Sequence, residues 1–293
     1  MANKEGFNHN NLDIVFKLHK TQRYIDIMNK VEDDLDPIYT YTSIMKELED
    51  FDHVLINRKK SSETGSVLKD DSKYHQMVLE CNTLLGDIEK EIGNVHNFIR
   101  DECRLKFPEL ESQVHDPFLY ARAVKYTGNH VYFPSIKRRL PEEVFQKVFQ
   151  ACDLVLTLDT SKNKLLEYVT RRMVYVAPNL CGVVGREVAA KLMVAAGSLE
   201  SLADMPASDV QLLGTENNIS LLSSHYSNKF GVAYIEETDV FKTARRDMKM
   251  LVSRHLAEKS VIAARIDSAR DDPSGSYGRT CLQEFRNKNI DLF

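Results

Sequence analysis

Aromatic and basic side chains alternate over a short segment in the last third of the chain. Residues 215–231 include His225, Tyr226, Lys229 and Phe230, and a run of lysines and arginines follows them. Aromatic rings stack on unpaired bases, each stack contributing about 1–3 kcal/mol, while nearby lysine and arginine neutralise phosphates. These residue types therefore favour recognition of RNA with exposed bases. The alternative is a surface loop that leads into a helix with a solvated basic face.

The basic run lies between residues 241 and 265 of a 293-residue chain whose net charge is −4. It contains seven lysines and arginines against two carboxylates, namely Lys242, Arg245, Arg246, Lys249, Arg254, Lys259, Arg265, Asp247 and Glu258. Acidic residues cluster instead near the start, at 32–36. Such an uneven distribution is typical of a surface that contacts phosphates, which the average charge conceals.

Helical spacing within the basic run separates cations from apolar side chains. For a helix that begins near residue 243, the inward stripe comprises Ala244, Met248, Leu251, Val252 and His255. The cations then share another face, with Arg254 at its flank, and they are Arg245, Arg246 and Lys249. The sequence therefore predicts a concentrated basic face directly after the aromatic segment.

The segment before these residues, 177–214, is rich in glycine and small side chains. Gly182, Gly185 and Gly197 are predicted to allow tight turns or close backbone contacts, since glycine in a helix interior costs up to about 1 kcal/mol relative to alanine. The GVVG sequence resembles the GxxG loop of KH domains, but the three strands of that domain are not predicted. Residues 195–214 are similar in spacing to a helix-hairpin-helix module, although its second hairpin is missing.

Motifs that carry catalysis are absent from the sequence, which has no G-x-S-x-G, no P-loop, no H-E-x-x-H and no dinucleotide-binding glycine pattern. The nine histidines are scattered, and His75, His96 and His115 are expected to be surface or edge side chains. The five cysteines form no C-x-x-C pair and no cluster with histidine, which argues against a disulfide framework or a zinc site. We therefore expect a protein that is not an enzyme and that needs no metal or other cofactor.

The N-terminal residues 1–11 lack the hydrophobic core of a signal peptide, and no apolar run approaches the roughly 18–20 residues of a membrane span. The odd number of cysteines fits a reducing compartment. The expectation is a soluble, intracellular protein with no membrane partner.

A seven-residue apolar repeat marks the first half of the chain. Its members alternate at spacings of four and three, and they are Tyr74, Val78, Cys81, Leu85, Ile88, Ile92, Val95 and Ile99. Such a seam predicts a long helix that packs lengthwise against another helix. The expected partner is residues 37–56, and the polar link at 58–66 makes the pair an antiparallel hairpin.

Prolines and polar breaks divide the rest of the chain, and Pro108 is expected to end or kink the long helix. The segments that follow are a helix at 116–125, a loop or marginal strand at 129–139, a helix from Pro141 to 159, a break at 159–162, and a helix at 164–177. No alternation of strand and helix and no tandem repeat is present, so the expected fold is all-α.

The expected domain organisation has four parts. They are an N-terminal segment at 1–36, an elongated helical coiled-coil arm at 37–150, a globular helical domain at 151–270, and a C-terminal linker with a short tail at 271–293. Residues 271–280 form the linker, and the residues after them are expected to form a short helix or a frayed end.

Several blocks of the sequence resemble the Nop domain family, whose members bind RNA and protein in ribonucleoprotein particles. The blocks are APNL at 177–180, AAKLMVAAGSLESLADMPAS at 189–208 and QLLG at 211–214. Two more resemble the spliceosomal branch of the family, EIGNVHNFIRDECRLKFPELESQV at 91–114 and AARIDS at 263–268. The FPELES part favours this branch over the box C/D snoRNP core proteins, which stay an alternative. A helix-hairpin-helix DNA-binding or repair protein is the alternative from another class.

The resemblance, which spans about residues 74–270, implies a coiled-coil arm followed by a globular Nop domain in a non-catalytic, nuclear protein. Members of the spliceosomal branch recognise a kink-turn RNA, the 5′ stem-loop of U4 snRNA, together with a small kink-turn-binding protein already seated on it. They support assembly of the U4/U6 and tri-snRNP particles in splicing. The expected partners are therefore U4 snRNA, the small kink-turn-binding protein and other U4/U6 and tri-snRNP proteins.

The resemblance also implies site residues. Contacts with the protein partner are expected at Asn179, Gly185, Arg186 and Lys191. Lys249 and Arg254 fall at basic positions of the RNA-facing helix of the family.

Two positions depart from the spliceosomal pattern. Gly231 stands where the family has a histidine that stacks on an RNA base, and Asp204 stands where it has a lysine. We expect the stacking role to pass to His225, Tyr226 or Phe230. The expected RNA-binding set is therefore His225, Tyr226, Lys229, Gly231, Arg245, Arg246, Lys249 and Arg254.

Overall fold

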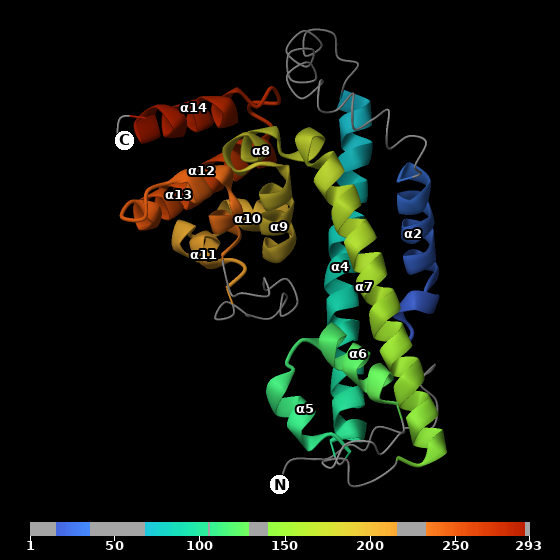
Figure 1. Ribbon diagram of the computed structural model, residues 1–293. Helices are drawn as coiled ribbons and strands as arrows, with labels where there is room; N and C mark the ends of the chain where they lie inside the picture. The colour runs from blue at the N-terminus through green and yellow to red at the C-terminus, as the bar shows by residue number, and fades with distance from the viewer. Residues whose placement is uncertain (1–15, 36–67, 105, 129–139, 216–232, 291–293) are drawn as a thin grey trace, which may run out of the picture. The chain divides into compact units, whose positions relative to one another are not determined.

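The computed structural model describes residues 16–35, 68–104, 106–128, 140–215 and 233–290, and every regular element among them is a helix (Figure 1). The α-helices are α2 (Gln22–Asp34), α4 (Leu68–Cys103), α5 (Pro108–Gln113), α6 (Pro117–Thr127), α7 (Glu142–Val176), α8 (Pro178–Val184), α9 (Arg186–Ala196), α10 (Leu199–Asp204), α11 (Ala207–Leu212), α12 (Asp239–Thr243), α13 (Lys249–Ala269) and α14 (Ser276–Ile290). Two short 3-10 helices are η1 (Leu18–Lys20) and η3 (Tyr234–Glu237). The all-α expectation is confirmed.

The chain forms two compact units, each made of two separate stretches of sequence. Unit 1 comprises residues 1–29 and 87–164, and unit 2 comprises 30–86 and 165–293. The divisions between the two units fall within the sequences of α4 and α7, whereas the boundary expected from the sequence falls near residue 150, also within α7. None of the described helices has an apolar stretch long enough to cross a membrane.

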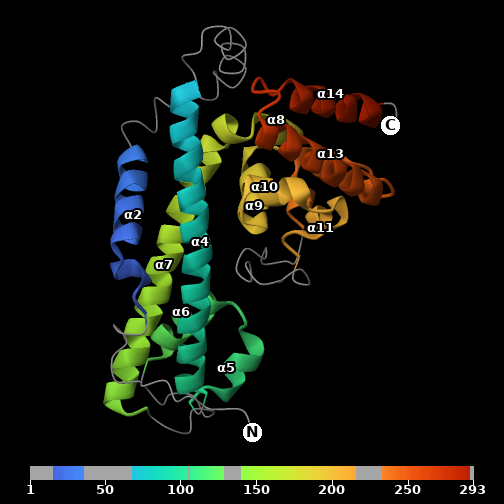
Figure 2. The ribbon, with the colours of Figure 1, turned by 180° about the vertical axis from the view of Figure 1, so that it is seen from behind.

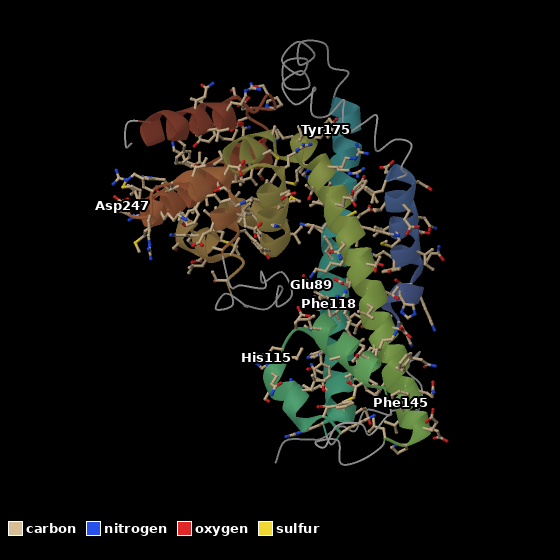
Figure 3. The ribbon with its side chains drawn as sticks, in the orientation of Figure 1. Glu89, His115, Phe118, Phe145, Tyr175 and Asp247 are labelled. Carbon is tan, nitrogen blue, oxygen red and sulfur yellow. The ribbon has the colours of Figure 1, made fainter. Side chains whose placement is uncertain are left out.

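The predicted heptad seam is the buried face of α4. All of its members whose side chains are described are fully buried, namely Val78, Cys81, Leu85, Ile88, Ile92, Val95 and Ile99. The expected partner helix at 37–56 lies outside the described residues. Within unit 1, α4 packs beside α7, where Glu89 and Lys162 form a buried ion pair at 3.3 Å (Figure 3).

Helix α7 is continuous, and the predicted break at 159–162 is wrong. Thr160 and Ser161 turn their hydroxyls back to the helix, donating to the carbonyls of Leu156 and Thr157 at 3.1 Å each. Such bonds leave the helical backbone intact. The buried stripe also continues across this stretch, through Val155, Leu158, Leu165, Tyr168 and Val169. Burial of that stripe outweighs the weak helix propensity of the polar residues.

Local signals mark the end of α4 and the start of α6 near the residues expected, whereas α5 was not predicted. Helix α4 ends at Cys103, and Pro108 occupies the first turn of α5. Asp116 caps α6, since its Oδ1 accepts hydrogen bonds from the amides of Phe118 and Leu119 at 2.9 and 2.8 Å. The segment at 129–139 lies outside the described residues.

Helix α8 is the centre of unit 2, and all seven of its residues are buried. Both α13 and α14 pack against it, and α10 and α11 pack against α13 (Figure 2). A short helix that is buried on every side needs apolar or internally bonded residues throughout. The sequence PNLCGVV meets this condition because its single polar side chain, Asn179, is hydrogen-bonded internally.

The C-terminal segment is a docked helix, so the expected linker at 271–280 is wrong for its second half. Helix α14 begins at Ser276 and approaches α8 so closely that a Cβ at Gly278 would lie 2.2 Å from the carbonyl oxygen of Asn179. A Cβ at Gly182 would lie 2.8 Å from the backbone of Gly278. These two glycines permit the backbone contact, which confirms the close approach predicted at Gly182.

Candidate nucleic-acid interface

The residues predicted to meet RNA fall into two groups. His225, Tyr226, Lys229 and Gly231 lie outside the described residues, as does the segment 216–232 around them. Arg245, Arg246, Lys249 and Arg254 are described, and all four lie in unit 2 at or near the start of α13.

Helix α13 begins at Lys249, six residues later than predicted. Helix α12 ends at Thr243, and Ala244 has an extended backbone with φ −66° and ψ 144°. Arg245 then bonds to Asp247 two residues later, with a guanidinium-to-carboxylate distance of 3.0 Å. Arg245 and Arg246 therefore lie in a turn ahead of the helix, where Asp247 is also exposed (Figure 3).

The later start changes which residues face inward. Leu251 and His255, predicted in the buried stripe, are exposed. The buried face of α13 consists of Val252, Ser253, Leu256, Ala257, Ser260, Val261, Ala263, Ala264 and Asp267. The helix is therefore rotated relative to the predicted register, and Leu251 joins the solvent side with Arg254.

Two of the exposed cations form ion pairs with carboxylates that are themselves partly or largely exposed. Arg245 bonds to Asp247, and the Nε of Arg254 lies 3.1 Å from Glu258 one turn later. Exposed ion pairs of this kind contribute about 0–1 kcal/mol and are screened by salt. A phosphate can therefore replace these carboxylates at little cost, and bidentate contact suits the arginine guanidinium.

Lys249 is held differently from the arginines. Its ammonium lies 4.9 Å from the centroid of the Phe241 ring, and that ring is buried at the end of α12. A cation within about 6 Å of an aromatic face is attracted to the ring by about 0.5–1 kcal/mol at exposed sites. The ring therefore fixes the direction of Lys249 without neutralising its charge.

Large apolar side chains are exposed beside these cations, and the sequence analysis missed them. Met250 is 81% exposed, and Leu251 and Leu212 are also on the surface. Helices α11 and α13 are joined at this point by a 3.2 Å hydrogen bond from Gln211 to Ser253. Exposed apolar groups next to cations fit a surface that meets both a protein and a nucleic acid.

Asn179, predicted to touch a protein partner, is 0% exposed. Its Nδ2 donates to Asp267 at 2.8 Å and to the carbonyl of Asp272 at 2.7 Å, and its Oδ1 accepts from the amide of Gly278 at 3.2 Å. The side chain is therefore an internal link among α8, α13 and α14. It cannot contact a partner in this conformation.

Asp267 is a buried residue of unit 2 to which the sequence analysis gave no role. Its carboxylate accepts hydrogen bonds from the amides of Asn179 at 3.1 Å and Leu180 at 2.8 Å, which caps the first turn of α8. Burial raises the pKa of Asp267 to about 7, because removal from water costs the carboxylate more than these hydrogen bonds return. The sequence signal that could have identified Asp267 is its position in the AARIDS block, which resembles the spliceosomal branch of the family.

The other predicted partner contacts lie at or after the junction of α8 and α9. Gly185 is exposed and has φ +84°, a conformation that favours glycine. A Cβ atom added at this position would have no described atom beyond its chain neighbours within 4 Å. Arg186 follows it at the first position of α9 and is half-buried. Lys191, one and a half turns later, forms an ion pair with Glu237 at 2.5 Å.

In the part of the chain that the structure describes, the groups capable of catalysis or metal binding are buried or dispersed. All five cysteines are buried, and burial raises the pKa of the thiols of Cys81, Cys103 and Cys152 to about 12. His96 packs edge-on against Tyr120, with ring centroids 5.2 Å apart, and burial lowers its pKa. Among the described residues no group of three or more histidine, cysteine, aspartate or glutamate side chains could hold a metal ion.

Comparison with known proteins gives consistent matches over most of the chain. The family described as "Nop: snoRNA binding domain, fibrillarin" matches residues 84–290. The "U4/U6 small nuclear ribonucleoprotein Prp31 homolog" of Arabidopsis thaliana is 39% identical over 310 residues, covering 98% of this chain and 60% of the relative. Human "U4/U6 small nuclear ribonucleoprotein Prp31" is 30% identical, covering 85% of this chain and 54% of the relative.

A nucleolar relative matches as well. "Probable nucleolar protein 5-1" of Arabidopsis thaliana is 32% identical over 230 residues, covering 70% of this chain and 43% of the relative. Among solved structures, a chain of a fibrillarin/Nop5p complex matches with a TM-score of 0.40 and 19% identity, covering 90% of this chain and 84% of that one. The chain spans 60% or less of the length of these curated relatives.

Proposed function

Since the chain belongs to the Nop family, we propose that it is a non-catalytic component of a spliceosomal ribonucleoprotein, similar to Prp31, that binds RNA and protein together. The observation that carries the proposal is the start of α13, where Arg245, Arg246 and Arg254 are exposed beside the apolar side chains of Met250 and Leu251. Phosphates require the cations, and a protein surface requires the apolar groups.

The proposed ligand is a kink-turn RNA, the 5′ stem-loop of U4 snRNA, with a small kink-turn-binding protein already bound. Two of the matched relatives are named as components of the U4/U6 particle, which supports this choice. A composite ligand also fits the sparse surface, because few cations and few apolar groups would bind either component weakly alone. The chain would then support U4/U6 and tri-snRNP assembly in the nucleus.

The proposed contacts divide between the two parts of the ligand. Arg245, Arg246, Lys249 and Arg254 would meet phosphates. The aromatic and polar residues His225, Tyr226, Lys229 and Gly231 stay in the proposed RNA set, as a stacking and backbone contact. Gly185 and Arg186 would meet the small protein.

A binding assay tests the proposal directly. The chain is titrated against three labelled ligands: the kink-turn RNA with its small protein, the same RNA alone, and duplex DNA of equal length. We expect tight binding only to the RNA–protein complex. Equal or tighter binding to bare duplex DNA would overturn the proposal in favour of a helix-hairpin-helix DNA-binding protein.

The second candidate is a box C/D snoRNP core protein, which the match to a nucleolar relative supports. The two candidates differ in the RNA that they retain. In extracts, a tagged chain is expected to recover U4 snRNA and not box C/D RNAs. Recovery of box C/D RNAs in excess of U4 snRNA would favour the second candidate.

A further inference from the structure

Lys191 and Glu237 form a partly buried ion pair that joins α9 to η3. The Nζ and Oε2 atoms lie 2.5 Å apart, and the two side chains are 25% and 21% exposed. Because the pair is largely removed from water, its attraction is screened less than that of the exposed pairs near α13. Lys191 therefore makes a contact inside the chain that water and salt weaken only in part.

Glu237 belongs to a strap, residues 234–243, that leads to the cation Lys249. Thr238 ends η3, and its hydroxyl accepts a 3.3 Å hydrogen bond from the amide of Phe241 in the first turn of α12. The Phe241 ring then lies 4.9 Å below the Lys249 ammonium. The strap thus connects a fixed point on α9 with one cation of the candidate interface.

The beginning of the strap is fixed by uncharged contacts. The amide of Tyr234 donates to the carbonyl of Leu213 at 2.8 Å. Gly214 has φ +94°, and a Cβ there would lie 3.0 Å from the Tyr234 ring. The ion pair at Glu237 adds a second point, three residues later, which restrains how the strap enters α12.

We propose that Lys191 and Glu237 are positioning residues for RNA recognition: their ion pair holds the strap against α9, so that Phe241 presents the Lys249 ammonium to a phosphate. This inference rests on the proposed function. It gives Lys191 a role that is exerted through Glu237, in place of the direct partner contact predicted from the sequence.

Charge reversal separates positioning from contact. Removing one charge abolishes the attraction between the two side chains and loosens the strap. Exchanging the two charges keeps their attraction but inverts the charge that a ligand would meet at residue 191. The exchange therefore restores ligand affinity only if the pair acts by positioning the strap.

The test compares Lys191→Met, Glu237→Gln, the double variant of these two, and the exchange Lys191→Glu with Glu237→Lys. Affinity for the kink-turn RNA bound by its small protein is measured across a salt series, together with thermal unfolding and amide hydrogen exchange of α12. We expect each single variant to bind about three- to tenfold more weakly, the double variant to match the singles, and the exchange to bind within about twofold of wild type. Amide exchange in α12 should accelerate in the singles and recover in the exchange variant.

Epistasis with Lys249 completes the design. If the pair acts through Lys249, adding Lys249→Ala to Lys191→Met causes little further loss of affinity, whereas independent effects multiply. Multiplied losses overturn the positioning role. So does an exchange variant that binds more weakly than Lys191→Met, which would mean that Lys191 touches the ligand itself.

The two levels of proposal fail differently. Wild type that does not bind the RNA–protein complex overturns the proposed function and this role with it. The positioning role alone is overturned if the wild-type chain binds the complex and the Glu237→Gln variant has the same affinity and the same amide exchange in α12.

Discussion

At the scale of single residues, the candidate interface is defined by cations that keep their charge available. The Lys249 ammonium lies against the Phe241 ring, and Arg254 forms a solvent-exposed ion pair with Glu258, so neither charge is neutralised in a buried pair. Lys259, nearly three turns after Lys249 on the same helix, lies 5.8 Å from the centroid of the Tyr277 ring in α14. The same helix therefore offers cations on different sides.

This difference yields a prediction about salt dependence. Lys249→Ala or Arg254→Ala should weaken binding to the RNA–protein complex and lower the slope of log affinity against log salt by at most about one unit each, because one phosphate contact is lost. Lys259→Ala, the matched control, should leave the slope unchanged. A slope that is unaffected by the first two changes would remove these residues from the interface.

Gly278 carries a prediction about packing. Gly278→Ala places a methyl group 2.2 Å from the carbonyl oxygen of Asn179, so α14 must move away from α8. We expect a loss of about 1–3 kcal/mol in the free energy of unfolding, as for other overpacked sites. Urea denaturation measures the change.

Gly86→Ala is the matched control for this substitution. Gly86 lies in the middle of α4, and a Cβ atom added there would have no atom of another described element within 4 Å. The same change should there be neutral or stabilise the chain by up to about 1 kcal/mol, through helix propensity. Equal destabilisation at both positions would show that the α8–α14 contact is not the cause.

At the scale of elements, periodicity within one helix was predictable, whereas the ends of helices set by distant contacts were not. The seam from Val78 to Ile99 was read correctly because a heptad records burial along a single element. The break at 159–162 was predicted from local polarity, yet Lys162 and Ser161 are buried against residues far away in sequence. Tertiary burial overrode the local signal.

The same limit explains the errors in the candidate site. The predicted start of α13 ignored the turn that Arg245 and Asp247 stabilise, so the register placed Leu251 inward. Asn179 was placed at a partner surface because its hydrogen-bond partners, Asp267 and Gly278, lie 88 and 99 residues later in the sequence. Resemblance pointed to a segment of the chain, but only the packed structure shows which of its side chains reach the surface.

The pairing of α4 with α7 leads to a prediction about pH. Burial raises the pKa of Glu89 to about 7, against the attraction of Lys162. Between about pH 4.5 and 7 the folded chain therefore holds a proton that the unfolded chain, with a carboxyl pKa near 4.3, has lost. Stability from this group is complete below that window and declines as the pH rises through it.

Chemical denaturation at several pH values checks this dependence. The free energy of unfolding should fall more steeply between about pH 4.5 and 7 in wild type than in Glu89→Gln, which has no carboxyl to titrate. Asp267, whose pKa burial also raises to about 7, keeps part of the slope in the variant. Identical slopes in the two proteins would contradict a raised pKa at Glu89.

At the scale of the whole molecule, each compact unit draws on distant parts of the sequence. Unit 2 joins residues 30–86 to 165–293, and within it the Nδ2 of Asn82 in α4 donates to the carbonyl of Gly197 at 3.1 Å. A linear division at residues 150 and 270, as expected from the sequence, cuts through these associations. Such a division treats α14 as a tail, although Cys281 of α14 is buried.

Truncation distinguishes a tail from a structural helix. The fragment 151–270 lacks α14, which packs on α8, so the fully buried α8 would expose the side that Gly182 presents to Gly278. We expect this fragment to unfold at least about 5 °C below the fragment 151–293. Each kcal/mol lost from the free energy of unfolding lowers the melting temperature of a domain of this size by several degrees. Circular dichroism melts give the temperatures, and hydrogen exchange of the α8 amides shows where protection is lost. Because α4 also contributes to unit 2, both fragments should melt at a lower temperature than the full chain. Equal melting temperatures of the two fragments would show that α14 is a tail that unit 2 does not need.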